Sequence, residues 1–227
     1  TISSSNLDEF FEIRVANIKR QIAAGSARQG TDGLSPKVAF KAITHAARAL
    51  VRDQYDFFNA TLIAELNREG IRLFPPGSGP ASLRRWIRNY FRKEVLPVLT
   101  PLAVDPAHPF PRVLNKSLHF VVELEGTDAF HIPRRLGIVR APRNLPRIFK
   151  LPEHVCGGPH DFISLSTILR ECMDMVFPGM PVTGCYQFRV TRDSDLRVDE
   201  EHMSDLREAL EDKLSRRPYG SAARDSF

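Results

Sequence analysis

The chain has 227 residues, of which 42% are hydrophobic and 26% charged, with a formal net charge of +5 at pH 7. These values are typical of a soluble globular protein with one large or two small domains. No apolar run approaches the roughly 20 residues that a membrane-spanning helix needs, and no signal-peptide pattern is present, so a cytoplasmic protein is expected. The basic excess favours anionic partners without identifying the anion.

The first predicted helix runs from Leu7 to about Ala24. Asn6 stands where an N-cap would be, and Glu9 follows three residues later, as in a capping box. An apolar stripe recurs at intervals of three and four: Leu7, Phe11, Val15, Ile18 and Ile22. An amide at a helix N-terminus suits a phosphate oxygen, but Asp8 and Glu9 in the first turn oppose an anion. The pattern alone therefore favours a structural cap at Asn6.

A second, longer helix is predicted from Ser35-Pro36 to Glu69-Gly70, with Ser as N-cap, Pro in the first turn and Gly as the stop. A helix of about 50 Å cannot bury itself, so we expect it to pack along the first helix as an antiparallel hairpin. The connector from Ile71 to Pro80 is rich in Pro and Gly. We therefore predict a helical domain over residues 1–70 and a second domain over residues 71–227.

A third helix is predicted from Ser82 to Val95, with apolar and aromatic residues on one face and basic residues on the other. The aromatic residues Trp86, Tyr90 and Phe91 are expected to face the core. The basic face includes Arg84, Arg88 and Arg92. Such a face is most often a solvated surface, and the alternative is a surface that binds a polyanion.

The sequence then changes from helical to strand character. Five prolines between Pro97 and Pro111 exclude a regular helix or a central strand, and His108 within this segment is read as a loop residue. Strands are predicted at residues 118–124, 130–132, 136–139, 147–149 and 185–190, with helices at 165–177 and about 201–215. The expected fold class is α+β: an N-terminal antiparallel bundle of long helices, followed by a mixed α+β domain with a mainly antiparallel sheet.

No catalytic motif is evident. Neither GxxxxGK[ST] nor GxGxxG after a strand occurs, and the seven histidines lack metal-site spacing. The three cysteines, Cys156, Cys172 and Cys185, are expected to be free buried thiols. Acidic residues between 193 and 201 could hold Mg²⁺ but are read as turn and cap residues. We therefore assign no metal ligand.

Four stretches, in order, resemble the bacterial polyphosphate kinases. They are residues 6–15 (NLDEFFEIRV), 95–111 (VLPVLTPLAVDPAHPFP), 145–152 (LPRIFKLP) and 184–195 (GCYQFRVTRDSD). The resemblance implies an enzyme that reversibly transfers the terminal phosphate of ATP to inorganic polyphosphate through a phosphohistidine, with Mg²⁺. It also implies that the chain, which begins without Met, is a fragment whose two C-terminal catalytic domains are missing.

The resemblance further implies roles for this fragment. It matches the N-terminal helical domain and the following head domain, which contributes to a homodimer or homotetramer. Asn6 falls on the family residue that approaches the nucleotide phosphates, so the resemblance favours a phosphate contact where the pattern favoured a cap. The fragment alone is expected to be inactive. The full-length enzyme is expected to be cytoplasmic, with association with a membrane as the alternative.

Two other readings stay open. One is a non-catalytic module that binds nucleic acid or another polyanion through the basic face of residues 84–93. It is disfavoured because the aromatic residues of that helix are expected on the opposite face, whereas base stacking needs them among the charges. The other is a pure dimerisation module without ligand contacts. No nucleic-acid partner is expected.

Overall fold

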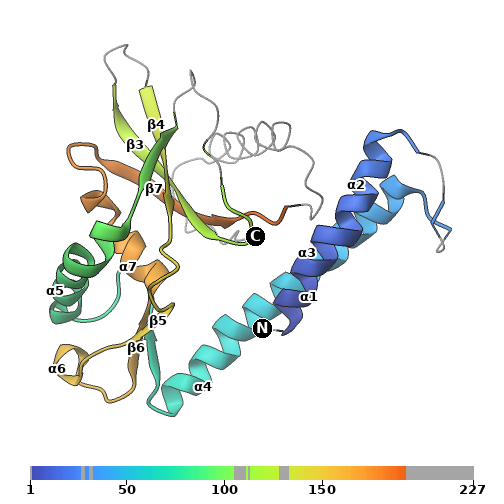
Figure 1. The fold of residues 1–227 in the computed structure, drawn as a ribbon. Helices are drawn as coiled ribbons and strands as arrows, with labels where there is room; N and C mark the ends of the chain where they lie inside the picture. Colours follow the sequence, from blue (N-terminus) through green and yellow to red (C-terminus); the bar gives the residue numbers. More distant parts are fainter. Residues whose placement is uncertain are drawn as a thin grey trace. The chain divides into compact units, whose positions relative to one another are not determined.

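The computed structural model describes residues 2–26, 29–30, 33–104, 111, 113–127 and 133–192 (Figure 1). It divides into two compact units, one with the residues up to Glu69 and one with Gly70 to Val190. Four sequence predictions lie outside the described residues: His108, the strand at 130–132, the acidic residues at 193–201 and the helix at 201–215.

The first unit is a helical hairpin (Figure 1). Its first arm comprises α1 (Ile2–Phe10), a π-helical turn (Phe11–Val15) and α2 (Ala16–Ala23). Its second arm comprises α3 (Pro36–Asp56), a π-helical turn (Phe57–Leu62) and α4 (Ile63–Arg68). The end of the first arm packs on the start of the second, because α2 contacts α3. The beginning of the first arm meets the far end of α3, where the Gln54 amide donates to the Ser3 hydroxyl at 2.6 Å. The predicted antiparallel helix pair is confirmed.

The predicted N-cap at Asn6 is wrong. The helix already includes Ile2 to Ser5, so Asn6 lies inside α1. Ser3 is held by Gln54 of the other arm, and this tertiary contact anchors helical residues ahead of the position that the capping pattern selected. The backbone N–H groups that follow Asn6 therefore bond to the preceding turn and offer no free donors to an anion.

The described residues of the second unit form two sheets. The three-stranded sheet has the order β1-β6-β5 and consists of β1 (Arg72–Phe74), β6 (Asp161–Ser164) and β5 (Ile148–Lys150). In it, β1 and β6 are parallel, and β5 and β6 are antiparallel. The four-stranded sheet has the order β2-β4-β3-β7 and is antiparallel throughout. Its strands are β2 (Pro101–Val104), β4 (Pro133–Arg140), β3 (Leu118–Thr127) and β7 (Val182–Arg189). The expected α+β architecture with a mainly antiparallel sheet is confirmed.

Helix α5 (Ala81–Tyr90) packs into the core of this unit and continues into a π-helical turn (Phe91–Val95). The residues at every fourth position along this helix are fully buried: Leu83, Ile87, Phe91 and Val95. They share one cluster with strand β3, through Phe120 and Val122, and with α7 (Leu165–Glu171). The period of the sequence predicted this helix correctly, because residues four apart lie on one face. The described part of this unit also contains three short helices: a 3₁₀ turn (Leu96–Val98), α6 (Glu153–Cys156) and a second 3₁₀ turn (Met173–Met175).

Some predicted boundaries were wrong. The connector after Ile71 contains β1, and β6 was not predicted at all, since strands of three and four residues are too short to establish a period. Helix α7 ends at Glu171 and not at Phe177, and the chain continues as a 3₁₀ turn. Strand β2 begins at Pro101 and occupies an edge of the sheet, where a missing N–H breaks no ladder bond.

All three cysteines are free, and Cys172 is fully buried, whereas Cys156 and Cys185 are half-buried. Burial raises the pKa of the Cys172 thiol to about 12 and that of Cys185 to about 11, so both are protonated at neutral pH. Among the described helices, none combines the length and apolarity that crossing a membrane requires.

Candidate functional site

Asn6 lies on an exposed part of α1, in the first unit. Its amide can therefore reach a ligand, although the backbone N–H groups that follow it bond to the preceding turn. The acidic neighbour Glu9, one turn later, is exposed as well. A phosphate contact at this position thus depends on the side-chain amide alone, and its assignment to Asn6 stays a prediction.

The basic face of α5 is exposed, but its charges are not equivalent. Arg88 forms an ion pair with Asp174, in which Nη2 donates to Oδ2 at 3.0 Å. Hydrogen bonding to Asp174, and then its negative charge, raise the pKa of the Arg88 guanidinium. Arg84 donates from Nη1 to the Gly79 carbonyl oxygen at 3.3 Å, and Arg92 is exposed on the turn that follows α5. Because Asp174 partly neutralises its central residue, this face offers a polyanion less charge than the sequence suggests. Its role stays a prediction.

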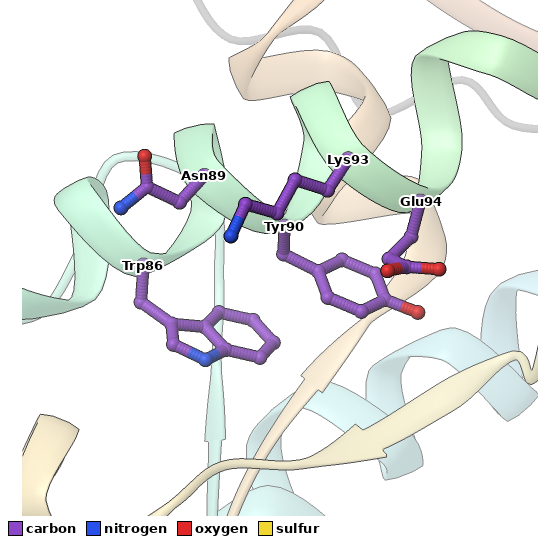
Figure 2. Close-up of a pocket in the computed structure, with 5 residues that line it drawn as sticks. All are labelled: Trp86, Asn89, Tyr90, Lys93 and Glu94. Atoms are coloured by element: carbon purple, nitrogen blue, oxygen red, sulfur yellow. The ribbon is translucent and has the colours of Figure 1, made fainter.

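The aromatic residues of the same helix differ in how far they are buried. Phe91 is buried as expected, whereas Trp86 and Tyr90 are half-buried and line an open pocket of about 280 Å³ with Asn89, Lys93 and Glu94 (Figure 2). The Trp86 and Tyr90 rings stack with centroids 5.1 Å apart and planes inclined by 7°. Desolvation, and then the Glu94 charge, raise the pKa of the Tyr90 hydroxyl.

Trp86 and Tyr90 pack against the core as expected, but they are only partly buried and so also line this pocket. Its rings lie beside one ammonium and one carboxylate, so the aromatic residues are not separated from the charges of the helix. However, the two rings stack on each other and present one platform, whereas binding of single-stranded nucleic acid uses several successive platforms. The pocket therefore adds little support for a nucleic-acid site.

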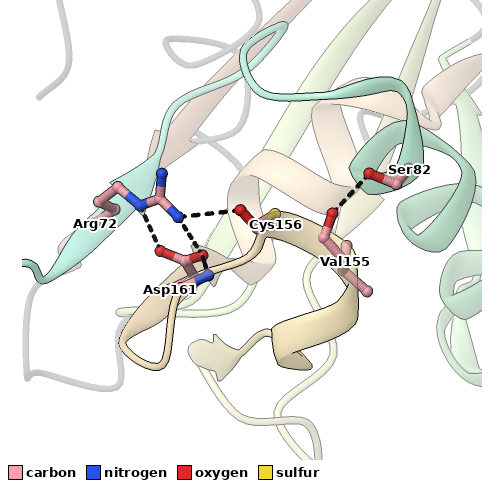
Figure 3. Close-up of polar contacts among 6 residues, drawn as sticks. Arg72, Ser82, Val155, Cys156 and Asp161 are labelled. Carbon is pink, nitrogen blue, oxygen red and sulfur yellow. Dashed lines mark hydrogen bonds and ion pairs between the residues drawn. The ribbon is translucent and has the colours of Figure 1, made fainter.

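Arg72 and Asp161 join β1 to β6 (Figure 3). The guanidinium donates from Nε to Oδ1 and from Nη2 to Oδ2, both at 2.6 Å, and Nη2 also donates to the Cys156 carbonyl oxygen at 3.2 Å. The Asp161 carboxylate is completely buried and accepts a further bond from the Gly158 N–H at 3.0 Å. Hydrogen bonding to Asp161 raises the pKa of Arg72. The fully satisfied carboxylate holds two strands and a loop together, which is a structural task.

His119 is a buried titratable group that the sequence pattern did not single out. Its side chain is 2% exposed on β3, Nδ1 donates to the Ser117 carbonyl oxygen at 2.9 Å, and the ring lies 5.5 Å from that of Phe188. Desolvation lowers the pKa of His119, and the charges of Arg140 and Arg143 lower it further, against the effect of the Ser117 bond. The imidazole is therefore neutral in the folded protein near neutral pH.

This burial predicts a loss of stability in mild acid. Below the ordinary pKa of 6.5, the unfolded state binds a proton at residue 119 that the folded state does not bind, so stability falls as pH falls. Between pH 7.5 and 5.5, denaturant unfolding should lose about 1 kcal/mol more in the wild type than in His119→Asn, whose amide can still donate to Ser117. His154→Asn, on an exposed residue, is the control. Equal losses in wild type and His119→Asn would show that His119 does not cause the acid sensitivity.

No metal centre can be built from the described part of the chain, because nowhere in it do three or more His, Cys, Asp or Glu side chains come together. We therefore assign no chemical step to a metal on the described residues.

A helical hairpin followed by an α+β unit is thus the class of structure that the described residues define. Two family models match the chain in this order: the polyphosphate kinase N-terminal domain over residues 1–74 and the polyphosphate kinase middle domain over residues 82–225. Together the two matches cover nearly the whole chain. The chain belongs to the polyphosphate kinase family.

Individual relatives agree. A polyphosphate kinase of Neisseria meningitidis serogroup C is 51% identical over 223 residues, which are 98% of this chain and 33% of the relative. That of Pseudomonas aeruginosa is 47% identical over 98% of this chain and 32% of its own length. The crystal structure of polyphosphate kinase from Porphyromonas gingivalis superimposes with a TM-score of 0.66 at 26% identity, over 87% of this chain and 28% of that one. The chain therefore spans about one third of the length of these relatives.

Proposed function

We propose that this chain is the N-terminal part of a polyphosphate kinase, which reversibly transfers the terminal phosphate of ATP to inorganic polyphosphate. The observation that carries the proposal is the pair of family-model matches in the order expected for such an enzyme. The identity of 47–51% to proteins named polyphosphate kinase supports it.

Within the complete enzyme, this part supplies a nucleotide-phosphate contact through Asn6 and a surface for a homodimer or homotetramer. The exposed position of Asn6 supports the first role, because its amide N–H can donate to a phosphate oxygen without competition from the core. A preorganised donor is most effective where negative charge is redistributed during phosphoryl transfer. The nucleophilic histidine belongs to the domains beyond this chain. ATP and Mg²⁺ are the expected ligands of the complete enzyme, which we place in the cytoplasm.

The proposal predicts that phosphotransfer requires the complete polypeptide. The full-length protein should convert labelled ATP and polyphosphate to longer labelled chains, and the reverse reaction should make ATP from ADP. This chain alone should give no labelled polyphosphate above background, because no nucleophile with an activating base is found in its described part. An inactive full-length protein would refute the proposed function, and an active fragment would refute the assignment of the chemistry to the missing domains.

A further inference from the structure

Three basic side chains gather at one end of the four-stranded sheet, and we refer to Lys116, Arg140 and Arg143 as the sheet-end cluster. Arg140 is the last residue of β4 and pairs directly with His119 of β3. Lys116 lies in the turn before β3, and Arg143 follows β4 by three residues. All three side chains are exposed. Because β3 and β4 are hydrogen-bonded neighbours and Arg143 contacts the residues on both sides of Lys116, this topology places the three cations at the same end of the sheet.

The turn that carries Lys116 is held in a defined conformation. Arg143 donates from Nε to the Ser117 hydroxyl oxygen at 3.0 Å and from Nη2 to the Asn115 carbonyl oxygen at 3.3 Å. Arg143 thus contacts the residues on both sides of Lys116, while its Nη1 takes no part in these bonds. The Lys116 N–H donates to the Val190 carbonyl oxygen at 2.9 Å. At φ 55°, Lys116 is the one residue other than glycine in the described ranges with a positive φ, which is a conformation that is uncommon for a lysine.

Among the described residues, the two arginines of the cluster have no acidic partner. Within residues 2–104, 111, 113–127 and 133–192, apart from the short gaps in the first unit, no carboxylate contacts Arg140 or Arg143. In the same described ranges, Arg68, Arg72 and Arg88 each have a carboxylate partner. The charges of both arginines lower the pKa of His119, which burial lowers as well. Two cations that act on the same neutral buried ring leave a local positive potential that an anion would relieve.

We propose that the sheet-end cluster binds a stretch of inorganic polyphosphate, an inference that rests on the proposed function. The cations come from two separate segments, the turn before β3 and the end of β4, and their side chains are exposed at one end of the sheet. This arrangement suits a chain with many adjacent negative groups better than one phosphate enclosed by converging donors. A growing polymer that is anchored at a second place stays near the enzyme between turnovers, because the second contact raises its effective concentration.

The test uses the full-length enzyme and fluorescently labelled long-chain polyphosphate, with affinity measured by anisotropy over a range of salt concentrations. The variant Lys116→Asn/Arg140→Gln removes two charges and keeps Arg143, whose bonds hold the turn. Asn adopts positive φ more readily than Lys, so the variant should fold. We expect its Kd for long-chain polyphosphate to rise about three- to tenfold at low salt, with a shallower salt dependence because fewer counterions are released on binding.

The matched control is Arg84→Gln/Arg92→Gln, which removes the same charge from the basic face of α5. The proposal expects a clearly smaller change in this control, and turnover of both variants with ATP and saturating short-chain polyphosphate should stay near the wild type. An unchanged Kd in the cluster variant, or an equal loss in the control, would overturn the proposal while leaving the enzyme's activity, and thus the proposed function, intact. Weaker binding of single-stranded DNA with unchanged polyphosphate binding would overturn it in favour of a nucleic-acid surface.

Discussion

In the complete enzyme, Asn6→Ala should lower turnover by roughly ten- to a hundredfold while leaving stability unchanged or slightly higher. The expected loss of activity rests on the proposed contact, in which Asn6 supplies one donor to the transferring phosphate. The stability follows from the position of Asn6 inside α1, on an exposed face, where Ala is a better helix former than Asn by several tenths of a kcal/mol. A capping Asn6 would give the opposite result for stability, a loss of about 1 kcal/mol.

Two further variants sharpen this prediction. Asn6→Asp keeps the size of the side chain but places a negative charge near the phosphates, so its turnover should fall at least as far as that of Asn6→Ala. Glu9→Ala changes an exposed residue of the same helix and should retain turnover within about twofold. Initial rates and melting temperatures of all three variants are the measurements. A folded Asn6→Ala enzyme with wild-type turnover would show that Asn6 makes no contact important for catalysis.

Asp161→Ala should destabilise the second unit by about 2–3 kcal/mol. The substitution removes a completely buried carboxylate and leaves the Gly158 N–H and the inner side of the Arg72 guanidinium without their acceptor. The cost is below that of breaking a fully buried pair, because the Arg72 side chain is 44% exposed and water can solvate it. The midpoint of denaturant unfolding, followed by a probe in the second unit, measures the effect.

Asp174→Ala is the control for this substitution. It breaks the Arg88–Asp174 pair, in which the two side chains are 49% and 54% exposed, and should cost less than about 1 kcal/mol. Similar losses in Asp161→Ala and Asp174→Ala would contradict the idea that burial sets the value of the Arg72–Asp161 pair. The enzyme's contact with nucleotide should be unaffected by the control.

Local periodicity accounts for the elements that the sequence predicted correctly. In the long arms of the hairpin and in α5, apolar side chains recur over many turns, so one face is defined by residues close in sequence. Strand β3 is likewise long enough to show β-branched and aromatic character. The polyphosphate kinase resemblance also came from the sequence, since its four motifs are contiguous stretches that need no fold to be recognised.

The ends of helices and the π-helical turns could not be predicted from the sequence pattern. The π-helical turns at Phe11–Val15, Phe57–Leu62 and Phe91–Val95 interrupt helices whose sequence pattern shows no break. The residues around Asn6 have the local chemistry of an N-cap. However, the hydrogen bond between Ser3 and Gln54, 51 positions away, stabilises helical residues before Asn6. A local signal cannot register such a contact, because the energy that decides the outcome comes from the other arm.

The sequence by itself determined the family, the antiparallel hairpin, the buried stripe of α5 and the mainly antiparallel sheet. Only the tertiary structure decided that Arg72 binds Asp161, which is 89 positions away in the sequence. The same holds for Arg88 and its partner Asp174, which is 86 positions away. It alone brought Lys116, Arg140 and Arg143 to one sheet end, through the pairing of β3 with β4. The physical reason is common to these cases: hydrophobic period is a property of neighbouring residues, whereas the partner of a charge is set by strand pairing and packing between distant segments.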